Sequence, residues 1–510
     1  MKTLETLKEL TSFLLEIQHI SSAAAVLSWD QETYMPPGGA EARADQLATL
    51  QGIAHQQFIS PKMENLLSQW IDLKTGALLE NADEAWDLQS KALLRETWRD
   101  YSKAKKLPLD FVKRMEKETS LALQVWVEAR EKNNYSLFKS HLSTIIKLKK
   151  EESDYRGYTE SPYDALLDTY EPGTKASQIA PLFDSLKKSI LPLLEKVRQA
   201  AHPPKDEILF VSYQPDRQLE FGHKVLKAMG YDFSRGRQDL SHHPFTTSFH
   251  PTDVRITTRI FEKGLPSALF GSIHEGGHAL YDQGLDPKFF GTPLGEFLSL
   301  GIHESQSRLW ENCVGRSKSF WKFFFPYLQN TFPDQLSKID LQTFYGAINL
   351  IKPSLIRVEA DELTYNLHIL LRFEIEKEVI EGNLEVNEIP SAWNSRMKTY
   401  LGIVPEKESE GPLQDIHWAH GSFGYFPTYT LGNLYSVQFF NQAKKELPDL
   451  LDQIEKGNLL PLKKWLNQKI HCWGRTFPTE ELVRRVTGEP LNPSYFIRYL
   501  EEKVKEIYHD

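Results

Sequence analysis

Cysteine is almost absent from this 510-residue chain, which contains only Cys313 and Cys472. Two cysteines cannot form the disulfide framework of a small secreted protein, and their scarcity indicates a reducing compartment. Neither has a second Cys or a His at the spacing of a zinc finger, which excludes a cysteine-based structural zinc site. We therefore expect a cytoplasmic protein whose fold depends on packing rather than on covalent cross-links.

Long uncharged apolar runs and an excess of positive charge are also missing. No segment reaches the roughly 18 uncharged apolar residues that a membrane helix needs, and residues 1–20 lack the apolar core and cleavage site of a signal peptide. Lys and Arg number 60 against 69 Asp and Glu, which gives a net charge of −9. We therefore expect neither a membrane nor nucleic acid among the partners.

Helical periodicity dominates the sequence. Helices are predicted at 4–20, 40–56, 85–105, 109–132, 135–152, 176–201, 216–229, 296–314, 341–350, 356–381, 429–445, 459–470 and 494–509, besides the segment that ends near Gly284. Strand-like alternation is clear only at 253–260. No repeat, low-complexity tract or long linker divides the chain. These patterns predict a mainly α fold in one domain over residues 1–510, with two lobes flanking a cleft as an alternative arrangement.

The segment His274-Glu275-Gly276-Gly277-His278 carries the strongest chemical signal. On an α-helix, positions i and i+4 project from the same face, so both imidazoles can reach one metal ion. In zincin hydrolases this pattern supplies two metal ligands, and the Glu takes a proton from metal-bound water. The motif predicts a metal-dependent hydrolase of peptides with Glu275 as general base. The alternative is an ordinary helix with two satisfied histidines.

The two glycines inside the motif are unusual for a buried helix. Each costs about 1 kcal/mol relative to alanine in a helix interior, although Leu269, Ile273 and Leu280 provide apolar backing. A glycine in such a position allows substrate or another backbone to approach closely. We therefore expect Gly276 and Gly277 to mark a close contact.

Two histidines leave a zinc ion short of a third protein ligand, with one further position open for water. The best candidate is Glu304 in the downstream segment His303-Glu304-Ser305-Gln306-Ser307. A short connection can fold this second predicted helix back against the first. His303 is the competing ligand, and an exposed polar turn is the alternative interpretation. The predicted metal ligands are therefore His274, His278 and Glu304.

Further motifs along the chain, in this order, resemble those of one peptidase family. They are Trp29-Asp30, Met35-Pro36-Pro37-Gly38-Gly39-Ala40-Glu41-Ala42-Arg43, His243-Pro244-Phe245, Asp253-Val254-Arg255-Ile256-Thr257, the H-E-G-G-H and H-E-S-Q-S segments, Ile356-Arg357 with Ala360-Asp361-Glu362-Leu363-Thr364-Tyr365, and Gly411 with Gln414-Asp415-Ile416-His417-Trp418. Together they resemble the carboxypeptidase Taq family of zinc metallocarboxypeptidases, nearly end to end. The metal-binding and base positions show no departure from that pattern.

The resemblance implies a large helical zincin-type fold with a deep central groove and a small β-sheet beside the active-site helix. It implies a homodimer that removes single C-terminal residues from peptides with broad side-chain tolerance. The implied cofactor is Zn²⁺, which Co²⁺ can replace.

A carboxypeptidase must recognise a free α-carboxylate, and the planar fork of arginine suits that task. Arg357 is the first candidate, with a structural ion pair to Glu359 or Asp361 as the alternative. Arg255 is the second candidate, although it can equally anchor the strand on which it lies. Asp361 and Glu362 are also candidates for orienting the metal-binding histidines.

Peptide hydrolysis also needs donors for the developing oxyanion. His417 suits this role, and Asp415 can influence the orientation of its ring. Tyr425 is preferred as a second donor, and Tyr429 is predicted to bind substrate. The alternative for these residues is an aromatic cluster that fills the core.

The predicted function is a carboxypeptidase in which Glu275 assists attack of zinc-bound water on the last peptide bond. Two alternatives stay open. The same chemistry suits an oligopeptidase or a dipeptidyl carboxypeptidase that releases larger pieces. A non-catalytic peptide-binding protein with a vestigial metal site is the other, although intact ligand and base residues argue against it.

Overall fold

A computed structural model describes residues 2–80 and 86–508, and helices make up most of them, which confirms the predicted mainly α fold. Before the sheet come α1 (Lys2–Thr33), α2 (Ala40–Phe58), α3 (Pro61–Ser68), α5 (Leu88–Lys106), α6 (Leu109–Glu131), α7 (Tyr135–Arg156), α8 (Pro162–Leu167), α9 (Ala176–Arg198) and α10 (Pro215–Met229). After it come α11 (Leu265–Gly284), α12 (Leu300–Arg308), α13 (Lys318–Thr331), α14 (Pro333–Leu336), α15 (Leu341–Ile348), α16 (Tyr365–Glu381), α17 (Ile389–Leu401), α18 (Pro427–Glu446), α19 (Leu450–Glu455), α20 (Leu460–Lys469), α21 (Thr479–Thr487) and α22 (Ser494–Ile507).

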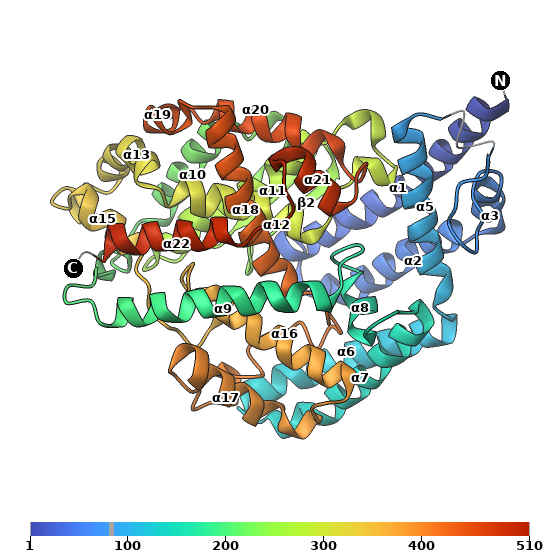
Figure 1. Cartoon of the computed structure of the whole chain (residues 1–510), viewed down its shortest axis with the longest axis horizontal. Coiled ribbons are helices and arrows are strands. Elements are labelled where there is room, and N and C mark those ends of the chain that lie inside the picture. The colour runs from blue at the N-terminus through green and yellow to red at the C-terminus, as the bar shows by residue number, and fades with distance from the viewer. Residues whose placement is uncertain (1, 81–85, 509–510) are drawn as a thin grey trace.

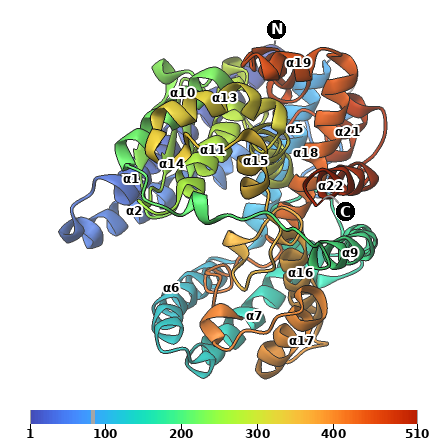
Figure 2. The ribbon, with the colours of Figure 1, turned by 90° about the vertical axis from the view of Figure 1, so that its left-hand side faces the viewer.

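The helices are arranged in two parts (Figure 1). Figure 2 shows α10, α11, α13 and α18 in the upper part and α6, α7, α16 and α17 in the lower part, with α9 at one side between them. One cluster of buried apolar residues runs through both parts and includes Phe138 of α7, Leu371 of α16 and Leu280 of α11. A second cluster lies among α1, α3 and α5. A deep groove between two lobes stays a prediction.

The first helix is the one described segment long and apolar enough to cross a membrane, over the 27 residues Leu7–Thr33. A core helix of a soluble protein passes the same test. Leu10, Phe13 and Leu14 of α1 are buried in the second apolar cluster, and Glu16 interrupts the uncharged run. The expectation that no membrane is involved therefore stays a prediction.

A small sheet lies against the motif helix. Its strands are β1 (Gln238–Leu240), β2 (Thr246–His250) and β3 (Asp253–Thr258), with β3 central, parallel to β1 and antiparallel to β2. The predicted strand at 253–260 is observed as β3. Its residues Val254, Ile256 and Thr258 are fully buried, and the strand packs against α11. The predicted sheet beside the active-site helix is therefore confirmed.

The two glycines of the motif, Gly276 and Gly277, lie at close contacts with other helices, as the sequence predicted. A Cβ on Gly277 would lie 2.7 Å from both the carbonyl oxygen of Gln306 and the Cα of Ser307, on α12. A Cβ on Gly276 would lie 2.5 Å from Cδ2 of Leu226, on α10. The motif helix is thus held between two neighbours, and α12 approaches its backbone directly.

The predicted helix at 356–381 begins nine residues late, as α16 at Tyr365, with a single 3-10 turn at Arg357–Glu359 before it. The cause is Asp361, whose Oδ1 accepts hydrogen bonds from the backbone N–H groups of residues 363 and 364. Such local bonds compete with those of a continuous helix. The predicted boundaries at 85 and 509 lie outside the described residues.

We predict that Gly277→Ala destabilises the protein by about 1–3 kcal/mol, because the added methyl group overpacks a backbone contact. The measurement is the midpoint of thermal unfolding. Gly271→Ala on the same helix is the control, since its Cβ would meet only ordinary contacts at 3.7 Å and 3.8 Å. Equal midpoints for the two variants would contradict the packing argument.

Candidate active site

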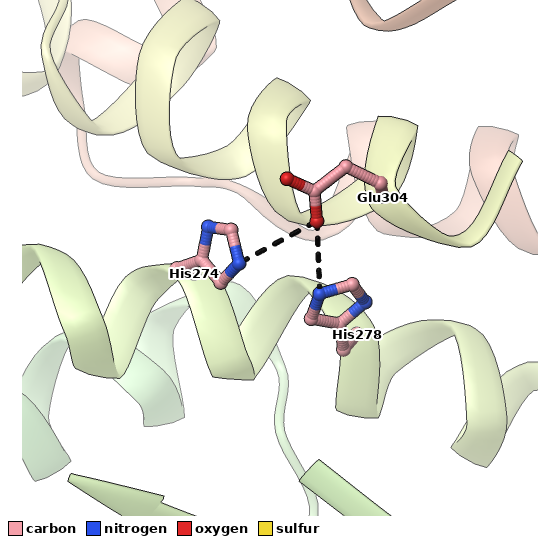
Figure 3. Close-up of side chains that lie close together, drawn as sticks. All are labelled: His274, His278 and Glu304. Atoms are coloured by element: carbon pink, nitrogen blue, oxygen red, sulfur yellow. Dashed lines mark ion pairs between the residues drawn. The ribbon is translucent and has the colours of Figure 1, made fainter. Parts of the chain in front are cut away.

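Two neighbouring helices bring the three predicted metal ligands together (Figure 3). His274 and His278 project from α11, and Glu304 projects from α12. The Oε2 atom of Glu304 lies 3.6 Å from Nε2 of His274 and 3.3 Å from Nε2 of His278. The three ligand atoms all lie within 4.8 Å of one another. These residues form a candidate metal site.

The protonation states of this triad suit a divalent cation. Burial and the neighbouring His303 lower the pKa of His278 to about 3, so its ring is neutral. Burial acts to raise the pKa of Glu304, but the positive charge of Arg308 holds that pKa well below its usual range. Burial acts to lower the pKa of His274, but the charge of Glu304 raises it above its usual value, so this ring releases its proton when a metal ion binds. Two imidazole nitrogens and one carboxylate oxygen form a donor set found in zinc hydrolases, which leaves a position open for water.

Glu304 rather than His303 completes the triad. Nε2 of His303 lies 3.1 Å from Oδ1 of Asp282, and its ring stacks on that of His278 with centroids 4.3 Å apart. Arg308, one turn after Glu304, donates its Nε–H to Oε1 of Glu304 at 2.7 Å. One carboxylate oxygen is therefore fixed by arginine, and the other faces the two imidazoles.

Glu311 orients the first histidine, a role that sequence reasoning missed. Its Oε2 lies 3.0 Å from Nδ1 of His274, which leaves Nε2 for a metal ion. Glu311 belongs to a π-helical segment, Leu309–Gly315, that continues α12. Such segments recur at functional sites, but no sequence pattern marked this one.

Asp361 and Glu362 do not orient the histidines, so this prediction was wrong. Asp361 binds the backbone at the start of α16. Glu362 accepts a hydrogen bond from Nζ of Lys503 at 2.6 Å. Both carboxylates therefore bind groups other than the metal-binding histidines.

The predicted base, Glu275, is held by the sheet. Its Oε2 accepts a hydrogen bond of 2.7 Å from Oγ1 of Thr246 on β2, and the same hydroxyl lies 3.0 Å from the Glu275 carbonyl oxygen. Burial raises the pKa of the Glu275 carboxyl. A carboxylate whose pKa moves toward neutrality is better matched to proton transfer.

The predicted oxyanion donors lie close to one another. Nε2 of His417 lies 3.3 Å from the hydroxyl of Tyr429, and the ring centroids of His417 and Tyr425 are 5.2 Å apart. Burial lowers the pKa of His417 to about 3, so its ring is neutral. Burial and the charge of Glu304 both raise the pKa of Tyr425, which couples this tyrosine to the metal site.

The whole chain is similar to known metallopeptidases. A family model for the carboxypeptidase Taq (M32) metallopeptidases matches residues 9–504. Carboxypeptidase 1 of Bacillus subtilis is 40% identical over 501 residues, which cover 98% of each protein. Thermostable carboxypeptidase 1 of Thermus thermophilus is 40% identical over 511 residues, again with 98% of each protein covered. The chain belongs to the carboxypeptidase Taq family.

The solved structures agree with that assignment. The M32 carboxypeptidase from Deinococcus radiodurans superposes with a TM-score of 0.95 at 36% identity, covering 99% of this chain and 100% of that chain. A carboxypeptidase structure from Pyrococcus furiosus gives a TM-score of 0.93 at 38% identity, with 98% and 99% covered. The predicted family is therefore confirmed, and the chain is a metallocarboxypeptidase with a His-His-Glu candidate metal site.

Both arginines considered for the substrate carboxylate have partners within this carboxypeptidase. Nε and Nη2 of Arg357 donate to Oδ1 of Asp415 at 3.0 Å and 2.8 Å, and Nη1 donates to the hydroxyl of Tyr365 at 2.9 Å. An ion pair was the alternative for Arg357, but Asp415 is its partner in place of Glu359 or Asp361.

Arg255 lies on β3 and pairs with a residue of its own strand. Its Nε lies 2.9 Å from Oδ1 of Asp253, and its guanidinium lies 4.4 Å from the ring centroid of Trp29. These contacts favour the strand-anchoring alternative for Arg255.

We predict that Glu311→Gln weakens metal binding about 10- to 100-fold, the usual range for loss of a carboxylate that orients a ligand histidine. Competition with a chelator measures the affinity. Glu362→Gln is the matched control, because that side chain is only 9% exposed but contacts Lys503 rather than a metal ligand. An affinity equal to that of the control would refute the orienting role of Glu311.

Proposed function

We propose that this metallocarboxypeptidase removes single residues from the free C-terminus of peptides with broad specificity, using Zn²⁺. The observation that carries the proposal is the triad of His274, His278 and Glu304 with Glu275 beside it on the same helix. A divalent ion bound there supplies Lewis acidity toward water and the scissile carbonyl. Zinc prefers tetrahedral coordination by nitrogen and carboxylate ligands, which supports Zn²⁺ as the bound ion. We expect Co²⁺ to be able to replace it.

Glu275 is the proposed proton carrier. Its carboxylate accepts the proton of the attacking water and delivers it to the leaving amine. The hydrogen bond from Thr246 holds one of its oxygens.

His417 and Tyr425 are the proposed donors to the oxyanion. A neutral histidine presents one N–H, and the raised pKa of Tyr425 keeps its hydroxyl protonated. Tyr429, which contacts His417, is proposed to bind the substrate beside them. Donors held ready in a dry site stabilise developing charge without reorganisation.

Arg357 is the proposed receptor for the substrate carboxylate, with Arg255 as the weaker candidate. Asp415 and Tyr365 take three of the five N–H donors of the guanidinium, counted among the described residues. Two N–H groups therefore remain for a carboxylate, and the fixed partners hold the guanidinium in one orientation.

The proposal extends to a homodimer in the cytoplasm that acts on peptides. The dimer is an expectation that the family resemblance implies, and the scarcity of cysteine supports a reducing compartment. Sedimentation of the purified protein and fractionation of its source cell test these two statements.

We predict that Glu275→Gln retains the metal but loses kcat by at least about 100-fold, because general-base catalysis contributes on the order of 10²–10⁴-fold. Metal analysis and a chelator-reversible peptidase assay on the same preparation provide the measurement. Turnover at the wild-type rate would remove Glu275 from the mechanism. A wild-type protein without bound metal or activity would favour the vestigial-site alternative.

We predict that a peptide with a free C-terminus loses one residue at a time, whereas its C-terminally amidated form is cleaved at least about 100-fold less well. The reason is that the guanidinium of Arg357 then has no substrate carboxylate to bind. Mass spectrometry of the products makes the measurement. Arg357→Lys should raise KM for the free peptide and leave the amidated one unchanged. Release of dipeptides or internal fragments would support the oligopeptidase or dipeptidyl alternative.

A further inference from the structure

The segment between α17 and α18 carries the proposed oxyanion donors, yet it has little regular structure of its own. His417 lies within it, and Tyr425 lies at its end, just before α18. The imidazole packs against the ring of Phe426, with centroids 4.5 Å apart, but has few polar restraints. Its Nδ1 lies 4.0 Å from Oδ1 of Asp415, which is beyond hydrogen-bond distance, and its Nε2 reaches Tyr429 only at 3.3 Å. Other groups must therefore set the position of this segment.

Glu376 on α16 binds the sequence neighbours of both donors. Its Oε1 accepts the indole N–H of Trp418 at 2.9 Å, and Trp418 directly follows His417. Its Oε2 accepts the backbone N–H of Gly424 at 3.0 Å, and Gly424 directly precedes Tyr425. One carboxylate thus binds both ends of the stretch from Trp418 to Gly424, which separates the two proposed donors.

The backbone at Gly424 lies too close to α8 for any side chain at this position. Gly424 has a φ of +89°, and a Cβ there would lie 2.8 Å from the carbonyl carbon of Leu166 on α8. Glycine is the residue that adopts such a φ without steric cost. The backbone at this point is therefore pressed against α8 while its N–H points to Glu376.

A third donor completes the environment of this carboxylate. The hydroxyl of Tyr163, on α8, donates to Oε2 of Glu376 at 2.8 Å. Glu376 is fully buried and has no ion-pair partner among the described residues. Burial raises its pKa to about 7 in spite of these hydrogen bonds. A buried carboxylate without a directly paired cation is costly in a core, so simple packing does not explain it.

The same face of α16 holds the other end of the segment. Arg372 lies one turn before Glu376, so the two side chains project from one side of the helix. Its Nε donates to Oδ2 of Asp415 at 2.7 Å, and Asp415 lies two residues before His417. Side chains of α16 therefore bind the segment on both sides of His417, at Asp415 and at Trp418.

We propose that Glu376 is a positioning residue that fixes His417 and Tyr425 through their neighbours Trp418 and Gly424. The inference rests on the proposed roles of His417 and Tyr425 in the reaction. Glu376 itself touches neither reacting group, and the metal ligands on α11 and α12 do not depend on it.

The test compares Glu376→Gln with Glu378→Gln. Glu378 lies on the same helix but pairs with Arg396, at 2.6 Å, instead of the segment. Both oxygens of Glu376 accept hydrogen bonds from N–H or O–H groups. The side-chain amide of the Glu376→Gln variant would instead point its NH₂ group at one of these donors, so at least one hydrogen bond is lost. We expect faster hydrogen–deuterium exchange over residues 412–426, with bound metal unchanged. We expect kcat to fall about 10- to 100-fold while KM changes less than about 3-fold, since misplacement by about 1 Å has effects of that size. Glu378→Gln should resemble the wild type.

Unchanged exchange in a folded Glu376→Gln protein would overturn the inference. Faster exchange with an unchanged kcat would also overturn it, while leaving the carboxypeptidase assignment intact, because wild-type activity and the Glu275→Gln variant test that assignment separately. If Glu376→Gln fails to fold, Tyr163→Phe removes a single bond to the same carboxylate. We then expect the same changes with kcat lowered about 3- to 10-fold, the size of one ordinary net hydrogen bond, because the bonds to Trp418 and Gly424 remain. Unchanged exchange in this variant would refute the proposal.

Discussion

The direct contact between α11 and α12 is the constraint on which the site depends. At Gly277 the two backbones meet with no side chain between them, and this closeness brings Glu304 within 3.3 Å of His278. Gly432 of α18 has a similar role on the far side of α12, where a Cβ would lie 2.6 Å from Cγ of Glu304. The third ligand is therefore held between two glycine contacts, and its position is set by packing density rather than by a loop.

Two separate groups of polar residues hold the side chains of the proposed active site in place. One consists of Glu311, Arg308 and Thr246, which hold His274, Glu304 and Glu275 through short polar contacts. The other consists of Arg372 and Glu376 on α16, which hold the segment of the oxyanion donors. The first group lies on the helices and the sheet beside the candidate metal site, and the second lies on α16, in the lower part in Figure 2. Precise geometry at an active site requires such preorganised surroundings.

The parts of the fold that could be predicted are those governed by local patterns. The helices, the strand at β3 and the pair of histidines follow from side-chain periods of 3.6 and 2 residues. The start of α16 was missed because a single side chain, Asp361, overrides the helical pattern there. Glu311 was missed because a π-helical turn changes side-chain direction without a sequence signal.

The chemistry was predictable from sequence patterns: two imidazoles on one helical face, a carboxylate beside them, and a set of motifs typical of one family. Those features depend on residues a few positions apart, where geometry follows from the backbone period. Which carboxylates and arginines form pairs depends on the packing of the helices. Asp415 with Arg357, and Glu376 with Trp418, are separated by 58 and 42 positions in the chain. Such pairings are set by how helices pack, and no local pattern records them.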